Sequence, residues 1–358
     1  MKQHEYDRIC LGVSLGFGHT ISIPIAASTF NKKILIVFFQ ERSRYNLELE
    51  NILEIPHVTF LRFSFYTTHD IARKIIISLA KWTFSKRFGV KDFYYAYDNV
   101  SYKSSSANNF YKNFVDIHGI NPSAIAPDYN FWMPAYMSIV DNHKIKYNIS
   151  SSDKLTDDLN IENSIALYVR HKDQGEISKE RNAGDKEVYI NVIQNLTRKG
   201  YTIFLLGECM EIANALKQNQ RVKNRKLYRD KNLYDLVVPL RCTYFVGNAG
   251  GGTMIRALSK KSALIIEVFP FHWANPNSYI LFKRVKFGDV VMGVKEFRES
   301  EYDWYKMQYT NQIIPLNNTA EEIKSAVNFY ILDNDKSLKS TNSVGLWSDY
   351  GRSFEISN

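Results

Sequence analysis

The chain has 358 residues, of which 45% are hydrophobic and 23% are charged, a composition that suits a globular protein with two domains of roughly 150 residues each. Lysine and arginine number 46 against 37 acidic residues, and the net charge of +9 favours an anionic partner, either a phosphorylated ligand or an anionic membrane surface. No nucleic-acid motif is present, no apolar run reaches about 18 residues and the three cysteines are scattered, so we expect a cytoplasmic protein without a nucleic-acid partner.

The chain opens with an expected strand, a glycine-rich turn, a helix and a second strand. The apolar run at residues 8–14 predicts the first strand, and the β-branched and aromatic run at residues 34–39 predicts the second. A third strand is expected at residues 57–65. This alternation is typical of a parallel sheet, so we expect an N-terminal Rossmann-like domain over residues 1–150.

A long amphipathic helix is expected at residues 69–88. Its apolar residues recur at helical spacing, and they are Ile71, Ile75, Leu79 and Trp82. The basic residues near its end are Lys81, Lys86 and Arg87. One interpretation is a helix packed in the core with a solvated basic face. The other is a docking edge for the anionic inner face of a membrane, because basic residues and tryptophan both favour that interface.

A polar stretch at residues 151–163 predicts a linker, and a second series of alternating strands and helices follows it over residues 164–320. The expected fold class is therefore α/β, with two Rossmann-like domains facing a cleft. Ligands of such sheets bind beyond the carboxyl ends of the strands. Residues 321–358 are expected to form a C-terminal helix and tail, and we expect that helix to pack back on the N-terminal domain.

The stretch VGNAGGGTMIRAL, residues 246–258, places four glycines between an expected strand and an expected helix. Glycine has no Cβ, so the backbone can approach a ligand closely, and the start of a helix favours an anion. The spacing fits neither a P-loop nor a dinucleotide-binding fingerprint. The pattern favours a phosphate-binding turn over a plain tight turn, and the candidate residues are Asn248, Gly250, Gly251, Gly252 and Thr253.

Two further groups of residues follow expected strands. A basic group begins at the carboxyl end of the strand at residues 165–170 and contains His171 and Lys179 as well as the candidate site residues Arg170, Lys172 and Arg181. Arginine suits bidentate contact with phosphate, and a solvated loop is the alternative. His19 follows two glycines after the first strand, where a histidine would either act as a general base or donate to an anionic ligand.

Three segments resemble GT-B glycosyltransferases. The segment GFGHTISIPIAASTFNKKILIVFF is similar to the opening of that family, and VGNAGGGTMIRALSKKSALIIEVFPFHWANPNSY is similar to its donor region, where a glycine-rich turn and a helix take the diphosphate. Residues 168–208 resemble a bacterial branch of glycosyltransferases of surface polysaccharides, those of capsule and lipopolysaccharide. The aromatic-plus-glutamate donor signature of the plant and mammalian enzymes is absent.

The resemblance implies a transferase that moves a sugar from a nucleotide diphosphate or monophosphate sugar to a growing surface glycan or a lipid-linked acceptor. Arg170, Arg181 and the turn amides would neutralise charge on the leaving diphosphate, and His19 would deprotonate the acceptor. Glu267 is, by position, a ribose or sugar contact. The acceptor side would include Gly16 and Gly18. No DxD pair follows a strand, so we expect neither a metal nor a further cofactor.

Three other functions remain open. A pyruvyl transferase that uses phosphoenolpyruvate would have the same double-Rossmann frame and would also need an arginine-rich cleft and a histidine. A nucleotide-sugar epimerase would convert the donor without an acceptor. A non-catalytic binding protein would keep the fold and bind a nucleotide without turnover.

Overall fold

The chain forms two compact units, residues 1–150 and 151–358, in a computed structural model. The structure describes residues 5–13, 23, 24, 27, 32–40, 53, 55, 57–65, 67, 69–97, 158, 159, 162–170, 184–207, 209–228, 231–248, 250–269, 278–293, 296, 312–337, 352 and 353. In this part of the chain no helix is long and apolar enough to cross a membrane. The three cysteines, Cys10, Cys209 and Cys242, are buried and unpaired.

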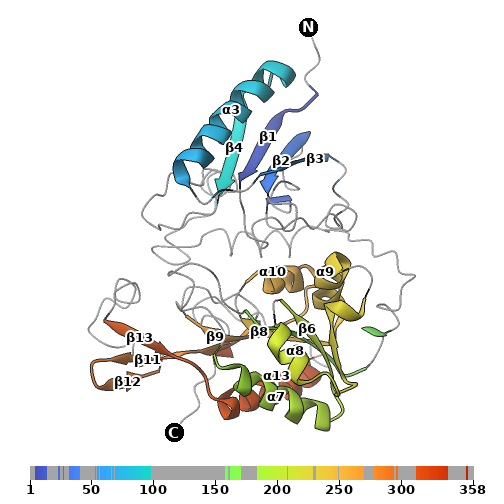
Figure 1. Cartoon of the computed structure of the whole chain (residues 1–358), viewed down its shortest axis with the longest axis vertical. Helices are drawn as coiled ribbons and strands as arrows, with labels where there is room; N and C mark the ends of the chain where they lie inside the picture. Colours follow the sequence, from blue (N-terminus) through green and yellow to red (C-terminus); the bar gives the residue numbers. More distant parts are fainter. Residues whose placement is uncertain are drawn as a thin grey trace. The chain divides into compact units, whose positions relative to one another are not determined.

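The N-terminal unit contains a parallel sheet of four strands in the order β3-β2-β1-β4 (Figure 1). The strands are β1 (Arg8–Val13), β2 (Ile34–Gln40), β3 (Val58–Ser64) and β4 (Asp92–Tyr97). The apolar runs of β1 and β2 are buried, as expected for the inner strands of a parallel sheet, whereas the residues of β3 at the sheet edge are half-buried or exposed. The strands predicted at residues 8–14, 34–39 and 57–65 are confirmed as β1, β2 and β3, whereas the glycine-rich turn at residues 16–19 lies outside the described residues.

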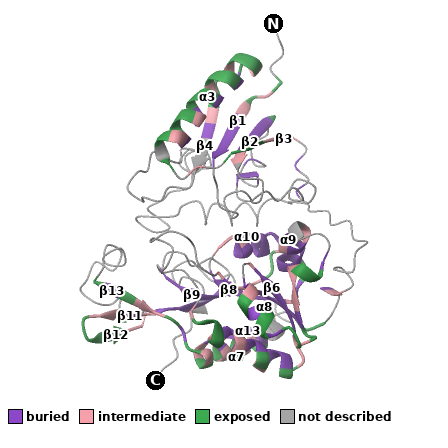
Figure 2. Ribbon diagram, viewed as in Figure 1, coloured by how far each residue is buried: buried purple, intermediate pink, exposed green. Residues whose placement is uncertain are grey.

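Helix α3 (Asp70–Phe88) packs on this sheet through a face that the sequence analysis did not select. Its buried apolar residues are Ile77, Ala80 and Phe84, which join the core made by Leu11, Val37 and their neighbours. The stripe that the sequence analysis selected, Ile71 to Trp82, is exposed instead (Figure 2). Of the two interpretations of this helix, packing of the Ile71 to Trp82 stripe in the core is therefore not what the structure has, because the helix carries apolar residues on two faces.

The C-terminal unit contains a sheet of seven strands in the order β14-β10-β9-β8-β5-β6-β7, with parallel pairs throughout. The strands are β5 (Ser164–Tyr168), β6 (Thr202–Leu206), β7 (Val222–Asn224), β8 (Tyr244–Asn248), β9 (Leu264–Val268), β10 (Tyr279–Phe282) and β14 (Arg352–Ser353). A separate antiparallel sheet has the order β12-β11-β13 and consists of β11 (Arg284–Phe287), β12 (Val290–Met292) and β13 (Ile313–Leu316).

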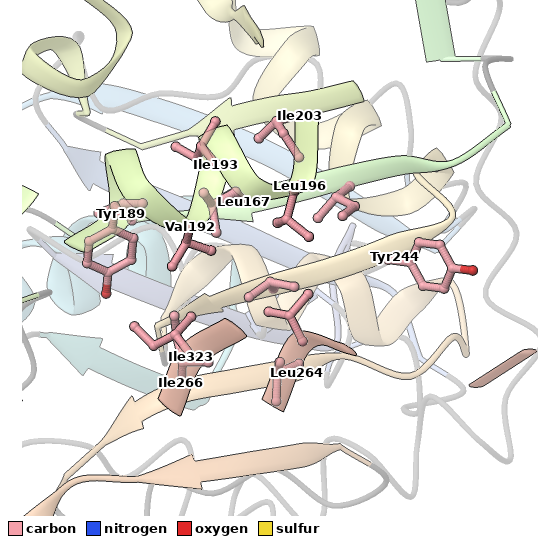
Figure 3. Packing of buried hydrophobic residues seen from close by; sticks show 14 of the residues in the cluster. Leu167, Tyr189, Val192, Ile193, Leu196, Ile203, Tyr244, Leu264, Ile266 and Ile323 are labelled. Carbon is pink, nitrogen blue, oxygen red and sulfur yellow. The ribbon is translucent and has the colours of Figure 1, made fainter. Parts of the chain in front are cut away.

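Helices lie on both faces of the large sheet (Figure 1). They are α7 (Lys186–Arg198), α8 (Met210–Ala215), η5 (Arg225–Leu227), α9 (Lys231–Arg241), α10 (Gly251–Leu258) and α13 (Ala320–Ser337). Residues of α7 and α13 share one core with alternate residues of the strands, among them Val192, Leu196, Leu264 and Ile266 (Figure 3). The unit is therefore a three-layer α/β structure with its own core.

The last helix, α13, packs against the sheet of the C-terminal unit. Ile323, Val327 and Tyr330 are buried in that core, and the Tyr330 hydroxyl donates to the carbonyl of Ser262 at 3.0 Å. We had expected this helix to pack back on the N-terminal domain. In the structure its buried apolar face lies in the core of its own unit, where it completes the layer that α7 begins.

Candidate functional site

The order of the large sheet defines a point at which the direction of strand addition reverses. From β5 the chain adds β6 and β7 on one side and then returns to add β8, β9 and β10 on the other. In open α/β sheets ligands bind beyond the carboxyl ends of the strands at such a switch point. Here that point lies between β5, which Arg170 follows, and β8, which leads into the glycine-rich turn.

Asn248, the last residue of β8, connects the two strands of the switch point. Its side chain is fully buried, and its Oδ1 atom accepts a hydrogen bond from the backbone N–H of Arg170 at 2.9 Å. Its Nδ2 atom lies 3.2 Å from Oε2 of Glu267 and 3.3 Å from the hydroxyl of Tyr189. The protein itself thus engages both ends of this amide, and the contact fixes the backbone that leaves β5.

Glu267, in β9, is the acceptor at the centre of this buried network. Its side chain is only 2% exposed, and its carboxylate accepts hydrogen bonds from the hydroxyl of Tyr189 and from the backbone N–H of Gly184, with 3.0 Å between Oε2 and that nitrogen. Burial, and then the negative charge of Glu267, raise the pKa of Tyr189 well above its ordinary value, so the phenol stays protonated at neutral pH and donates a hydrogen bond to the carboxylate.

The backbone of Glu267 has an unusual conformation for a residue with a side chain. Its φ is +54°, in the left-handed region that favours glycine, and its N–H donates to Oδ1 of Asn318 at 3.1 Å. Asn318 in turn donates to the carbonyl of Phe282 at 3.1 Å. Backbone outliers of this kind persist where the surroundings hold them, and they gather at functional sites.

The glycine-rich turn packs against the ring of Tyr168, the last residue of β5. A Cβ atom at Gly250 would lie 3.0 Å from the Tyr168 hydroxyl oxygen, and one at Gly252 would lie 3.1 Å from Cγ of the same ring. These two glycines therefore have a packing reason to be glycine. Helix α10 begins at Gly251. The first N–H groups of a helix have no acceptor within it, so this end of α10 suits an anion.

Thr253 stabilises the same turn from inside α10. Its hydroxyl donates to the carbonyl of Gly250 at 2.6 Å, and it is nearly completely buried. Thr253 is one of the residues predicted from the sequence to contact a phosphate. In the structure its hydroxyl is engaged by the turn, so any contribution to a ligand would come through the shape of the turn.

Two buried basic residues of the same unit were not predicted as site residues. Lys283 follows β10, is 2% exposed and donates from Nζ to Oδ1 of Asn317 at 2.7 Å. Arg256 in α10 donates to backbone carbonyls, those of Pro239, Cys242, Thr243 and Ser262. The burial of Lys283 and the role of Tyr189 both depend on contacts between residues distant in sequence, 34 residues apart for Lys283 and Asn317 and 78 residues apart for Tyr189 and Glu267.

The structure brings Arg170, Asn248, the turn at residues 250–253 and Glu267 together at the carboxyl ends of β5, β8 and β9. Arg170 is half-buried. The other predicted site residues lie outside the described residues, namely Gly16, Gly18, His19, Lys172 and Arg181. The described ranges contain no group of three or more His, Cys, Asp or Glu residues that would hold a metal ion.

No family model matches the sequence, and no curated protein matches it either. Several solved structures, in contrast, are similar to the structure of this chain. A glycosyl transferase family 9 protein from Veillonella parvula DSM 2008 has a TM-score of 0.53 and 11% identity, over 93% of this chain and 99% of that one. The iron-containing dodecameric glycosyltransferase TibC from enterotoxigenic E. coli H10407 has a TM-score of 0.50 and 9% identity, over 96% of this chain and 82% of that one.

The ADP-heptose lps heptosyltransferase II of E. coli has a TM-score of 0.49 and 12% identity, over 92% of this chain and 99% of that one. The two structures with higher scores confirm the expected fold class, an α/β fold with two Rossmann-like domains of the GT-B type. Likeness at this level of identity extends to the fold, and function has to be argued from the site.

Proposed function

We propose that this protein is a glycosyltransferase that moves a sugar from a nucleotide-activated donor to a growing surface glycan or a lipid-linked acceptor. The observation that carries the proposal is the glycine-rich turn, which leads from β8 into the start of α10 at the switch point of the C-terminal sheet. A turn and a helix start at this place in an α/β sheet favour a phosphate-bearing ligand.

In the proposed reaction an oxygen of the acceptor forms a bond to the anomeric carbon of the sugar. The bond between that carbon and the donor phosphate oxygen breaks, and the nucleotide leaves with the electron pair. Arg170, Lys172 and Arg181, together with the N–H groups at the start of α10, neutralise the charge that develops on the leaving phosphate. His19 takes the proton of the acceptor hydroxyl.

Glu267 has a different part in this proposal from the other donor-side residues. Its carboxylate is buried and accepts hydrogen bonds from Tyr189, Asn248 and Gly184, which supports a positioning role beneath the donor. Direct contact between Glu267 and the ribose or sugar stays a prediction. The Asn248 side chain likewise acts by holding the backbone of Arg170 in place.

We propose that sugar transfer needs no metal ion, because cationic side chains and helix amides supply the positive charge that the leaving phosphate requires. TibC is described as iron-containing, so metal dependence deserves a direct measurement. Activity that survives extensive treatment with a chelator supports this part of the proposal. Activity that disappears and returns with one added metal ion overturns it.

We also propose that the enzyme works in the cytoplasm at the inner face of the membrane, where a lipid-linked acceptor would be accessible. The lack of a membrane-spanning helix among the described residues is compatible with a protein that reaches this surface from solution. Cell fractionation, followed by detection of the chain in the soluble and membrane fractions, tests the location.

The proposal is tested by screening the full-length protein against phosphoenolpyruvate and against sugar nucleotides that differ in base and sugar, with thermal unfolding as the readout. A ligand present at about 100 times its dissociation constant adds roughly 2.7 kcal/mol of stability. The matched control is Gly251→Val, in which a side chain at the first residue of α10 would block close approach of a phosphate.

Each outcome of this screen separates the proposal from its alternatives. Stabilisation by one sugar nucleotide, its loss in Gly251→Val, and transfer of labelled sugar to an acceptor support a glycosyltransferase. Stabilisation by phosphoenolpyruvate alone indicates a pyruvyl transferase. Conversion of the donor without an acceptor indicates an epimerase, and binding without any turnover indicates a non-catalytic protein.

A further inference from the structure

Helix α3 exposes a continuous apolar stripe on the N-terminal unit. Four large side chains form it, and their exposed fractions are 75% for Ile71, 54% for Ile75, 59% for Leu79 and 66% for Trp82. Their spacing of four, four and three residues places them on one face of the helix, along about 17 Å of its length. Exposed apolar residues are ordinary when scattered, but a row of four on one helix indicates an interaction surface.

The stripe is not a part of the core that happens to be solvent-accessible. The opposite face of α3 already packs on the sheet through Ile77, Ala80 and Phe84. Arg73, also on that face, is 2% exposed and donates from Nε to the carbonyl of Thr67 at 2.9 Å. The N-terminal sheet thus has its covering helix, and the stripe faces away from that contact.

Basic residues accompany the stripe. The Nζ atom of Lys86 lies 5.4 Å from the centre of the Trp82 ring, four residues earlier on the same face. Lys74 is exposed three residues after Ile71 and is its neighbour on the helix surface. The sequence of α3 contains five basic residues and one acidic residue, Asp70. The surface therefore combines apolar side chains with positive charge.

The structure changes which basic residues belong to this surface. Lys81 is partly buried, and burial lowers its pKa. The guanidinium of Arg87 lies 5.2 Å from the ring centre of Phe88, on the side of the helix that borders the core. Of the three residues selected from the sequence, only Lys86 is placed on the stripe, and Lys74 joins it.

We propose that the stripe of α3, with Lys74 and Lys86, docks the protein on the surface of a bilayer that contains anionic lipids. A helix with an apolar face and flanking lysines lies in the plane of such an interface, with the apolar face among the acyl chains and the amines at the headgroups. Tryptophan favours the same depth. This inference rests on the charge and exposure of α3 and is independent of the proposed sugar transfer.

Charge complementarity favours the bilayer over a second copy of the chain. Two copies packed through this face would bring Lys74 and Lys86 of both chains close together, and the helix has only one acidic residue to offset them. Like charges that face one another at an interface oppose association. An anionic leaflet instead attracts each lysine and accepts the apolar side chains.

Binding of the full-length protein to sedimented vesicles tests this inference. Vesicles of phosphatidylcholine alone are compared with vesicles that contain increasing phosphatidylglycerol, at low and high salt. We expect binding to rise with anionic lipid and to fall with salt. Each lysine near an anionic leaflet strengthens binding about fivefold, so Lys74→Gln with Lys86→Gln should weaken it about 25-fold.

Matched controls separate this face from the general charge of the protein. Lys217→Gln with Lys226→Gln removes the same charge from exposed positions of the C-terminal unit and should leave binding unchanged. Leu79→Ser with Trp82→Ser should weaken binding strongly, whereas Leu332→Ser, at an exposed apolar position of α13, should not. Circular dichroism and light scattering establish that each variant is folded and of unchanged size.

A spectroscopic measurement reports the depth of the stripe directly. Quenching of tryptophan fluorescence by brominated lipids should occur on binding and should decrease in Trp82→Phe, which keeps the apolar character. Equal weakening by the two lysine pairs, or unchanged quenching in Trp82→Phe, overturns the inference. So does the absence of binding to any vesicle, or a dimer in solution that the Leu79→Ser and Trp82→Ser changes dissociate.

Discussion

The backbone N–H of Arg170 donates to Oδ1 of Asn248 at 2.9 Å, across the switch point of the C-terminal sheet. The same Asn248 side chain donates to Glu267, and Glu267 accepts the N–H of Gly184. Residues 170 and 184 border the basic stretch that contains Lys172 and Arg181. Both ends of this stretch are therefore attached to one buried carboxylate and its amide partner.

We expect Glu267→Gln to destabilise the protein and to weaken donor binding. The new amide would present N–H groups to Tyr189, Asn248 and Gly184, which are donors already, and one unsatisfied buried group costs about 1–3 kcal/mol. The free energy of unfolding in urea measures the first effect, and the dissociation constant of the donor measures the second.

The matched control is Glu321→Gln, at an 82% exposed side chain in α13, which should change stability by less than about 0.5 kcal/mol. If Glu267→Gln is as stable as the control and binds donor normally, the network does not hold the site together.

Gly252→Ala tests the contact between the glycine-rich turn and Tyr168. The new Cβ would lie 3.1 Å from Cγ of that ring and 3.4 Å from Cζ of Phe245, so we expect a loss of about 1–3 kcal/mol of stability from overpacking. The second variant, Gly252→Ala with Tyr168→Leu, should recover part of the loss relative to Tyr168→Leu alone. Additive losses in urea unfolding would mean that the ring does not require this glycine.

The sequence allowed prediction of the features that depend on local patterns. Continuous apolar runs identified β1, β2 and β5, and the four glycines identified the turn before α10. The capping box at Thr319 and Glu322 was also predictable, and the structure has both of its hydrogen bonds, between the Thr319 N–H and Oε2 of Glu322 at 2.6 Å and between the Glu322 N–H and Oγ1 of Thr319 at 3.2 Å.

The sequence could not indicate contacts between distant residues. Tyr189 reaches Glu267 across 78 residues, and Asn248 reaches Arg170 across the same number, so no local pattern connects them. The face of α3 was ambiguous for a different reason. Ile77 and Phe84 recur at helical spacing as Ile71 and Ile75 do, and only the sheet beneath the helix decides which pair is buried.

Arg170→Ala and Arg181→Ala should each weaken donor binding. One charge-assisted contact to phosphate contributes about 1.5–3 kcal/mol, which corresponds to a roughly 10- to 150-fold higher dissociation constant. Arg198→Ala, at an exposed residue at the end of α7, is the control and should leave affinity unchanged. Titration calorimetry with the donor found in the thermal screen gives the affinities. Wild-type affinity in both variants would indicate that the basic stretch containing Arg170 and Arg181 is a solvated loop that does not contact the donor.

His19→Ala should lower turnover by about a hundredfold or more and leave donor affinity nearly unchanged, as expected for loss of a general base. Steady-state transfer assays and donor titration, carried out on the same preparation, separate the two effects. A loss of donor affinity with normal turnover at saturation would instead make His19 a ligand contact. Full activity would assign the base to another residue.

Asp235 in α9 should make stability depend on pH. Burial raises its pKa from 3.8 to about 6, against the opposing effect of Arg225, whose Nη1 lies 3.3 Å from Oδ2. The other carboxylate oxygen, Oδ1, has no hydrogen-bond partner in the described part of the chain. Between pH 4 and pH 6 the folded protein therefore holds a proton that the unfolded chain has released. The contribution of this group to stability is complete below pH 4 and is lost as the pH rises through 6.

The loss is on the order of 2–3 kcal/mol, since one pKa unit corresponds to about 1.4 kcal/mol. Asp235→Asn keeps the shape of the side chain and cannot ionise, so it should be more stable than wild type at pH 7 and nearly equal to it at pH 4. Urea unfolding at several pH values measures the difference, with Asp289→Asn, at an exposed turn, as the control. Parallel pH profiles for wild type and Asp235→Asn would mean that Asp235 ionises in the folded protein much as it does in the unfolded chain.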